Sequence, residues 1–277
     1  MLHDLLVHIP SERSAGPVIG CAISLAGKLK AHLEAVAVGY ESVTAELVVE
    51  AGAAVAAITR IEQHRALEQA AAAIASFESE ARRADISYAT RTLSAQPADA
   101  AEALALLARV HDLTIVSQPD PDHRAFDDKV SPEVLFGSGG PVLMVPYIHE
   151  GALEANHVAI AWDGSRLAAR AVRDAMPFLI GAGHVTVITV NAERSGQEAS
   201  AAELAIRLGR RGIETRIERL TSTGGNVHNA ILSATADNGV DLLVMGGYGH
   251  SRWQERILGG VTQGIFETMT LPTLMSH

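Results

Sequence analysis

The sequence predicts an α/β protein of two tandem domains, each a doubly wound sheet of five parallel strands covered by helices. Three observations lead to this prediction: the chain repeats itself once, strands alternate with helices in each half, and a polar stretch separates the halves. Strands that alternate with helices form parallel βαβ units with right-handed crossovers. A chain of 277 residues is long enough for each half to bury its own core.

The repeat is visible at both ends of each half. Residues 3–11 (HDLLVHIPS) parallel residues 156–164 (NHVAIAWDG), each an apolar run that breaks into a turn before a helix. Residues 141–146 (PVLMVP) likewise parallel residues 272–277 (PTLMSH). Such self-similarity indicates two copies of one structural unit. We therefore assign residues 1–150 to one domain and 151–277 to another, with the boundary in the polar stretch around residues 147–154.

In the first half, apolar runs predict further strands at about 33–38, 86–93 and 113–117. Alanine and leucine at three- and four-residue spacing predict a helix over 98–110. An extra amphipathic segment from Glu41 to about Arg60 has no counterpart in the second half. We interpret this segment as an added covering helix rather than a functional lid.

In the second half, the same reasoning predicts strands at about 184–190, 213–220 and 241–245, with a helix over 226–238. A short polar loop, 192–198, takes the place of the extra segment. Both halves therefore predict the same order of elements.

Composition narrows the classes of function and location. A net charge of −10 without a long Lys/Arg cluster argues against nucleic acid as a partner. No window is apolar and long enough to span a membrane, and no signal-peptide pattern begins the chain. The single cysteine, Cys21, excludes an internal disulfide and suits a reducing compartment. We expect a cytoplasmic protein.

Glycines follow the fourth strand of the second half at a spacing that suits a phosphate site. Gly246, Gly249 and Gly259 come first, and residues 260–262 then open the last predicted helix. Glycine just past a parallel strand lets the backbone approach a ligand, and open α/β sheets bind ligands at the carboxyl ends of their strands. Unpaired N–H groups at a helix N-terminus favour a phosphate. The hydroxyl of Thr262 offers a further donor to a phosphate or a ligand to a metal ion.

These glycines, Asp163 at the end of the first strand of the second half, and the closing strand 272–275 together resemble the ATP-binding members of the universal stress protein family. The resemblance covers the whole chain at the level of the adenine nucleotide alpha hydrolase-like fold, and only the second half at the level of motifs. It implies that Asp163 lies beside the base and ribose and that the backbone of Val190 meets adenine.

The resemblance implies ATP or another adenine nucleotide as the cofactor, with Mg or Mn held by its phosphates. The cofactor-binding residues that we predict on this basis are Asp163, Val190, Gly246, Gly249, Gly259, Gly260, Val261 and Thr262. Apart from the hydroxyl of Thr262, we predict no residue that ligates a metal directly.

One position departs from the family pattern. Nucleotide-binding members carry Ser or Thr after the last glycine of the motif, and this chain has Gly260. The lost hydroxyl contact corresponds to about 1 kcal/mol, so we expect weakened binding.

The first half has lost more of the motif. Pro10 stands where Asp163 stands, and Pro119 follows the fourth strand in place of spaced glycines. We place the approach to its last helix at residues 136–140 and expect a simple turn there. The nucleotide site of the first domain is therefore expected to be degenerate.

These observations predict a stress-response protein that binds an adenine nucleotide in its second domain and acts as a ligand-dependent interaction module. We predict no catalytic residues, since no general base held by a third group is evident. Two alternatives stay open: a nucleotide-independent stress scaffold, and a slow ATPase or adenylating enzyme. We expect strands 142–146 and 273–276 to pair within the chain and form a pseudo-dimer, with homodimerisation of the whole chain left open.

Overall fold

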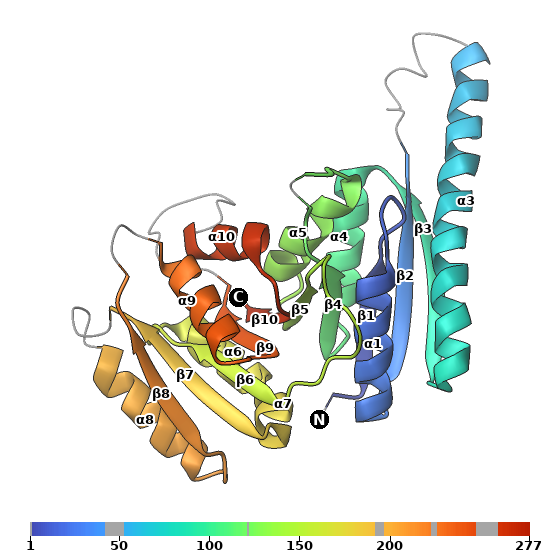
Figure 1. Ribbon diagram of the computed structural model, residues 1–277. Helices are drawn as coiled ribbons and strands as arrows, with labels where there is room; N and C mark the ends of the chain where they lie inside the picture. The colour runs from blue at the N-terminus through green and yellow to red at the C-terminus, as the bar shows by residue number, and fades with distance from the viewer. Residues whose placement is uncertain (1, 42–52, 121, 192–196, 223–225, 248–259) are drawn as a thin grey trace. The chain divides into compact units, whose positions relative to one another are not determined.

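The structure is a computed structural model that describes residues 2–41, 53–120, 122–191, 197–222, 226–247 and 260–277. Within these ranges the chain has an α/β fold in which mostly parallel strands alternate with helices, as the sequence predicts (Figure 1).

The elements follow one another in a regular order along the chain. They are β1 (Asp4–Ile9), α1 (Gly16–Leu29), β2 (His32–Tyr40), α3 (Ala53–Ala84), β3 (Tyr88–Ala95), α4 (Pro97–Ala108), β4 (Leu113–Ser117), the 3₁₀ helix η1 (Phe126–Lys129), α5 (Val130–Gly137), β5 (Val142–Val145), β6 (His157–Ala161), α6 (Arg166–Asp174), α7 (Met176–Gly181), β7 (His184–Val190), α8 (Gln197–Gly209), β8 (Thr215–Leu220), α9 (Val227–Asp237), β9 (Leu242–Gly246), α10 (Gly260–Thr268) and β10 (Thr273–Ser276).

The chain divides into two compact units. The first unit comprises residues 2–140 and 150–152, and the second comprises residues 141–149 and 153–277. In the first unit the strands lie in the order β3-β2-β1-β4 and are all parallel. In the second unit the order is β5-β10-β9-β6-β7-β8. Within this second sheet β5 alone runs antiparallel to its neighbour.

Strand β5 explains why the spatial division differs from the boundary near residue 150 that the sequence suggests. Leu143 of β5 lies opposite Leu274 of β10 in the antiparallel ladder. Because of this pairing, residues 141–149 pack with the second unit although they end the first sequence repeat.

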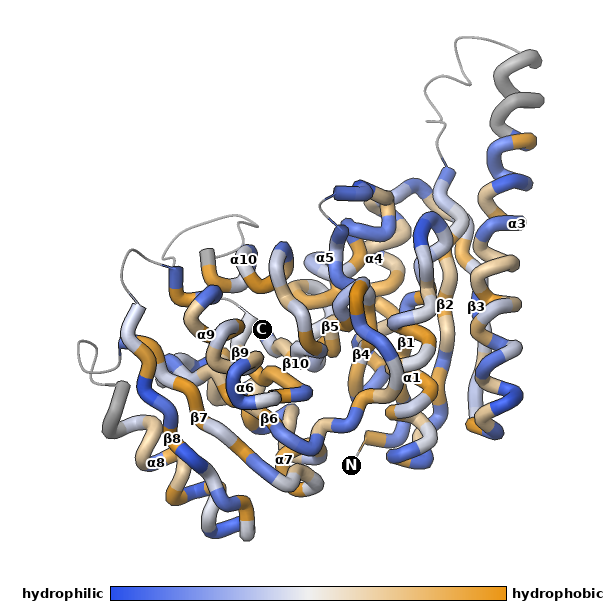
Figure 2. Tube along the Cα trace, in the orientation of Figure 1, coloured by the Kyte–Doolittle hydropathy of each residue, from blue (hydrophilic) through white to orange (hydrophobic). Residues whose placement is uncertain are grey.

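The inner strands are apolar on both faces, as expected where helices cover both faces of a parallel sheet. Leu5, Leu6, Val7 and Ile9 of β1 are all fully buried. The residues of the edge strand β8 are instead half-buried or exposed, and Figure 2 shows hydrophilic stretches along this strand. The core of each unit therefore lies between its inner strands and their covering helices.

In both units an aspartate carboxylate accepts hydrogen bonds from the backbone at the start of the first strand. In the first unit Asp112 accepts hydrogen bonds from the backbone N–H groups of His3 and Asp4, at 2.6 and 3.1 Å. In the second unit Asp241 accepts them from Asn156 and His157, at 2.9 and 3.1 Å. Each aspartate precedes the fourth strand of its half, so the structural details repeat along with the fold.

Most predicted elements lie within about two residues of their predicted positions. Strands β4 and β7 match the predicted ranges 113–117 and 184–190, and α4 begins one residue early because Pro97 occupies its first turn. The extra segment does not form a helix of its own in the part described: residues 53–60 are the beginning of the long helix α3. The remainder of that segment, residues 42–52, lies outside the described residues.

The last helix of the first half lies earlier than expected. Helix α5 ends at Gly137, so residues 136–140 leave this helix instead of leading into it. Gly139 adopts a φ of +74°, which glycine tolerates and which turns the chain toward β5. The expectation of a simple turn holds, while the expected direction of approach is wrong.

No helix among the described residues is both long and apolar enough to cross a membrane.

Candidate functional site

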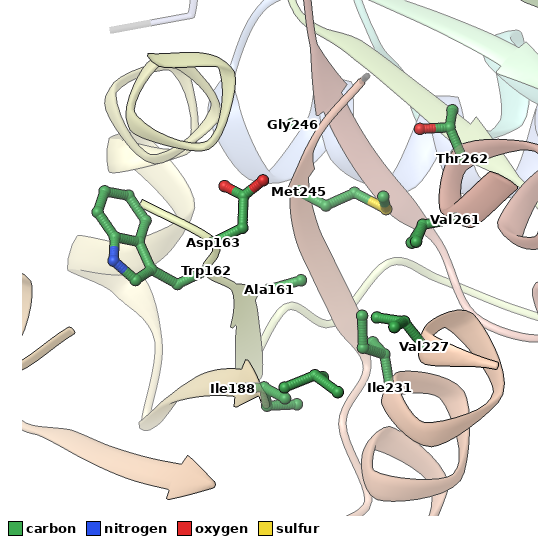
Figure 3. Close-up of a pocket in the computed structure, with 11 residues that line it drawn as sticks. Ala161, Trp162, Asp163, Ile188, Val227, Ile231, Met245, Gly246, Val261 and Thr262 are labelled. Carbon is green, nitrogen blue, oxygen red and sulfur yellow. The ribbon is translucent and has the colours of Figure 1, made fainter. Parts of the chain in front are cut away.

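A cavity of about 220 Å³ lies in the second unit at the carboxyl ends of β6, β7 and β9 (Figure 3). Helices α9 and α10 supply its other walls. The residues that line it are Ala161, Trp162, Asp163, Ile188, Val190, Val227, Ile231, Met245, Gly246, Val261 and Thr262. Open α/β sheets bind ligands at this edge, so the cavity is the first candidate for a functional site.

Asp163 is held at the rim of the cavity by the turn between β6 and α6. Its Oδ1 accepts a hydrogen bond from the N–H of Ser165 at 2.9 Å, and the Ser165 hydroxyl in turn accepts one from the N–H of Ala168 at 3.1 Å. Gly164 between them has a φ of +75°, a conformation that glycine adopts without steric cost. No described residue donates a hydrogen bond to Oδ2 of Asp163. The carboxylate is thus fixed through one oxygen and offers the other to a ligand.

One wall of the cavity is entirely apolar. Ile188 and Val190 come from the end of β7, and Val227 and Ile231 from the first turns of α9. Beyond Val190 the chain turns at Asn191, whose side chain donates to the carbonyl of Ser222 at 3.2 Å and accepts from its N–H at 3.0 Å. These two hydrogen bonds join the ends of β7 and β8 beside the apolar wall. The apolar wall suits a flat hydrophobic group such as a heteroaromatic ring.

The N-terminus of α10 provides the polar end. The helix begins at Gly260, and its residues Val261 and Thr262 line the cavity. The first N–H groups of a helix have no partner within the helix, and the helix dipole makes this end attractive to anions. The cavity therefore has an apolar wall, a fixed carboxylate and a helix N-terminus around one space.

Helix α10 is seated closely against α9. A Cβ at Gly264 would lie 2.5 Å from Cγ of His228, well inside van der Waals contact. The bare Cα of Gly264 therefore sets how near α10 approaches α9, and through this the position of its N-terminus beside the cavity.

Gly246 has a packing role that the motif did not suggest. A Cβ at this position would lie 2.7 Å from the backbone nitrogen of Ala168 and 2.8 Å from the carbonyl carbon of Leu167. Glycine is thus required here because the first turn of α6 crosses the end of β9. Gly246 also lines the cavity, so this residue both allows α6 to pack closely and forms part of the cavity wall.

The structure brings together five of the predicted site residues in the lining: Asp163, Val190, Gly246, Val261 and Thr262. Gly260 is the first residue of α10. The other two predicted residues, Gly249 and Gly259, lie outside the described residues.

Sequence reasoning missed the apolar part of the site: Ala161, Ile188, Val227, Ile231 and Met245. These residues belong to no motif, and each also reads as an ordinary core position of a strand or helix. The sequence signal that could have identified them was their position near the carboxyl ends of strands, or at the start of the helix that faces those ends.

The chemistry of the lining is simple. Asp163 is the one ionisable side chain among the described residues that line the cavity. No group of three or more His, Cys, Asp or Glu side chains suited to a metal ion occurs among the residues described. The described site can bind a polar ligand with an apolar part, and it contains no paired acid and base or activated nucleophile.

The corresponding edge of the first unit is filled by side chains. His8 occupies the position in β1 that Ala161 occupies in β6, and it is 2 % exposed. Asp127 of η1 lies against it, with 3.4 Å between its Oδ1 and Nε2 of His8. Asp127 also accepts hydrogen bonds from the Tyr40 hydroxyl at 2.8 Å and from the Glu12 N–H at 3.1 Å. A buried polar cluster thus takes up the space that remains open in the second unit.

Burial shapes the ionisation of this cluster. Desolvation lowers the pKa of His8 from its ordinary value, although the Asp127 carboxylate opposes the effect. Desolvation, with the negative charge of Asp127, raises the pKa of the Tyr40 hydroxyl. Desolvation also raises the pKa of Glu12, opposed by the hydrogen bond from the Phe126 N–H. His8 is therefore neutral at neutral pH.

Comparison with known proteins gives a consistent picture. Residues 154–277 match the model of the universal stress protein family. Universal stress protein Slr1230 of Synechocystis sp. is 26% identical over 124 residues, a match that spans 42% of this chain and 41% of that protein.

Two solved structures are similar over nearly the whole chain. A universal stress protein from Archaeoglobus fulgidus has a TM-score of 0.71 at 16% identity, over 98% of this chain and 97% of the other. A putative universal stress protein from Pseudomonas aeruginosa has a TM-score of 0.59 at 18% identity, over 99% and 93%. At these identities the structural likeness establishes the fold.

Proposed function

Because the chain is a UspA-like protein of the universal stress protein family, and so a stress-response protein, we propose that its second unit binds ATP or another adenine nucleotide. The bound nucleotide would make the protein a ligand-dependent interaction module, whose affinity for a protein partner differs between the free and bound states.

The observation that carries the proposal is the arrangement around one cavity of an apolar wall, a carboxylate and a helix N-terminus. The wall of Ile188, Val190 and Ile231 suits the faces of adenine. Oδ2 of Asp163 suits a ribose hydroxyl, because an ionised carboxylate only accepts hydrogen bonds. The N-terminus of α10 suits the phosphates.

Gly260 lowers the expected affinity. It is the first residue of α10, at the end of the helix where a Ser or Thr hydroxyl would otherwise meet a phosphate. The backbone N–H groups of α10 do not depend on this side chain. We therefore expect binding that is weaker by about tenfold or less than with a hydroxyl at this position.

The lining favours binding over catalysis. Asp163 has no described ionisable neighbour in the cavity that could act as its acid or base partner. Mg or Mn, where it accompanies the nucleotide, would be held mainly by the phosphates, since the described lining supplies one carboxylate. Slow hydrolysis assisted by such an ion is compatible with this arrangement.

The test is a calorimetric titration of the full chain with ATP and magnesium, compared with Ala161→His. This substitution introduces into the second unit the residue that the first unit has at the same position of its repeat. We expect the imidazole to fill the cavity and to lower ATP affinity by at least about tenfold. An alanine-to-histidine change at the exposed Ala98 of α4 is the matched control and should leave affinity unchanged.

Equal affinity of wild type and Ala161→His would place any nucleotide elsewhere and contradict the proposal. No binding at millimolar ATP would favour the alternative that Gly260 motivates, a stress scaffold that works without nucleotide.

A further inference from the structure

A second cavity lies in the same unit, between helices α6 and α8. It has a volume of about 540 Å³, which falls within the usual range for sites of small organic molecules. Val172 of α6 and Leu204 and Leu208 of α8 are buried and form its apolar floor. Met176 and the indole of Trp162 extend this floor. We call this cavity the α6–α8 groove.

Four arginines surround the apolar floor. Arg173 comes from the end of α6, Arg207 from the last turn of α8, and Arg210 and Arg211 from the residues that follow α8. All four are exposed. Glu203 is the one carboxylate among the described residues of the lining. The groove is therefore strongly cationic in a chain whose net charge is −10.

Within the described residues, no carboxylate forms an ion pair with these four arginines, Arg173, Arg207, Arg210 and Arg211. Arg173 donates through Nε to the carbonyl of Ala169 at 3.2 Å, which leaves its terminal nitrogens for other acceptors. Arginine presents a planar fork of donors that matches a carboxylate or phosphate.

The groove is distinct from the cavity beside Asp163. Trp162 is the one described residue that lines both. Its indole points away from Met245 and Val261 (Figure 3), and its Nε1 donates to the Ser200 hydroxyl at 3.0 Å. The indole therefore belongs to the α6–α8 groove, while its backbone neighbour Asp163 belongs to the other cavity.

From this arrangement we propose that the α6–α8 groove binds a small organic anion with an apolar body: a carboxylate or phosphate head held by Arg207 and Arg211, and a hydrocarbon or aromatic part on the floor of Val172, Leu204 and Trp162. An apolar floor alone would not select for charge, and arginines alone would not need a concave apolar surface. Their combination selects an amphiphilic anion. The proposal does not depend on nucleotide binding.

The test uses dodecanoate below its micelle-forming concentration as the probe, titrated calorimetrically into the full chain. We expect saturable binding of one molecule per chain, weakened at least about fivefold by Arg207→Glu or Arg211→Glu. Arg216→Glu is the matched control, because Arg216 is an exposed arginine of β8 outside the groove. Dodecyltrimethylammonium, with the same chain and the opposite charge, should not bind.

A steric variant tests the floor separately from the charges. Ala169 lines the groove and is half-buried, so Ala169→Phe should fill the space and abolish dodecanoate binding with all four arginines kept. Far-UV circular dichroism and urea midpoints confirm that each variant is folded. ATP affinity should stay unchanged in Arg207→Glu, which separates this proposal from the nucleotide site.

The same head-group chemistry could come from a free anion or from a membrane surface. Sedimentation with phosphatidylglycerol vesicles distinguishes the two sources. A protein that binds dodecanoate but stays in the supernatant when the vesicles sediment takes a free ligand. Co-sedimentation lost in Arg207→Glu means that a lipid supplies the anion. The proposal is overturned if dodecanoate does not bind, if the cationic probe binds equally, or if the arginine and Ala169 variants bind like wild type.

Discussion

At the scale of single residues, one pair of equivalent positions distinguishes the carboxyl edges of the two sheets. Ala161 leaves the carboxyl edge of the second sheet open, and its methyl group lines the cavity. His8, at the same position of the first repeat, is buried against Asp127 and fills that edge. The space that corresponds to the cavity beside Asp163 is therefore filled in the first unit by a larger side chain and a carboxylate that partners it, without a change of fold.

The buried imidazole of His8 makes a testable contribution to stability. Its pKa in the folded protein lies below 6.5, so below that pH the unfolded chain takes up a proton that folded His8 resists. The stabilisation is present above pH 6.5 and is lost as the pH falls toward the pKa of the folded state. We expect the free energy of unfolding of wild type to fall between pH 7.5 and 5.5 by up to about 1.4 kcal/mol per pH unit more than that of His8→Gln.

Urea denaturation at several pH values measures this difference. The pKa of Glu12 is raised in the folded protein, so its contribution to stability changes with pH in the opposite direction to that of His8. Because Glu12 is present in both proteins, its contribution largely cancels in the comparison with His8→Gln. The charged neighbours Asp127 and Arg13 are likewise present in both proteins. Parallel pH profiles for the two proteins would contradict the assigned role of His8.

At the scale of elements, hydrophobic periodicity and the internal repeat were sufficient to predict the alternation of strands and helices. They placed β4 and β7 correctly because these strands are short apolar runs with clear ends. They did not show that residues 53–60 begin the long helix α3, because an alanine-rich amphipathic stretch looks the same whether it forms a new helix or extends the next one. Its described part belongs to α3, whose Ala66 carbonyl packs on the bare Cα of Gly39.

Part of the candidate site could be predicted for a physical reason. The start of α10 belongs to a glycine pattern that suits a phosphate, and Asp163 was found through its resemblance to the acidic residue of the universal stress protein family. The apolar wall could not be predicted, because Ile188 and Val227 have the residue types of any buried strand or helix. Their part in the cavity depends on the distance between β7 and α9, which follows from tertiary packing.

The contact between α9 and α10 gives a prediction at this scale. Gly264→Ala would place a Cβ 2.5 Å from the His228 ring, so α10 must move away from α9 and carry its N-terminus out of position. We expect ATP affinity to fall at least about fivefold although neither residue lines the cavity. The double variant Gly264→Ala, His228→Ala restores the space and should recover most of the affinity.

Calorimetric titration with ATP measures the affinity of the single and double variants and so tests this prediction. Loss of affinity in Gly264→Ala without recovery in the double variant would show that packing against His228 is not the cause. Unchanged affinity in the single variant would mean that the position of α10 does not matter for the ligand.

At the scale of the whole molecule, the chain divides into two compact units, in each of which strands alternate with helices. The strand-start carboxylates Asp112 and Asp241 keep the same backbone contacts in both units, so the scaffold is maintained. The edge at the carboxyl ends of the strands differs: it holds a cavity beside Asp163 in the second unit and the buried cluster of His8, Asp127 and Tyr40 in the first.

We propose that one chain binds one adenine nucleotide and that the second unit holds it. Native mass spectrometry of the full chain, purified in volatile buffer and titrated with ATP and magnesium, counts the bound nucleotides directly. We expect one nucleotide per chain at saturation in the wild type and none in Ala161→His. Two nucleotides per chain, none at millimolar ATP, or one that persists in Ala161→His would contradict it.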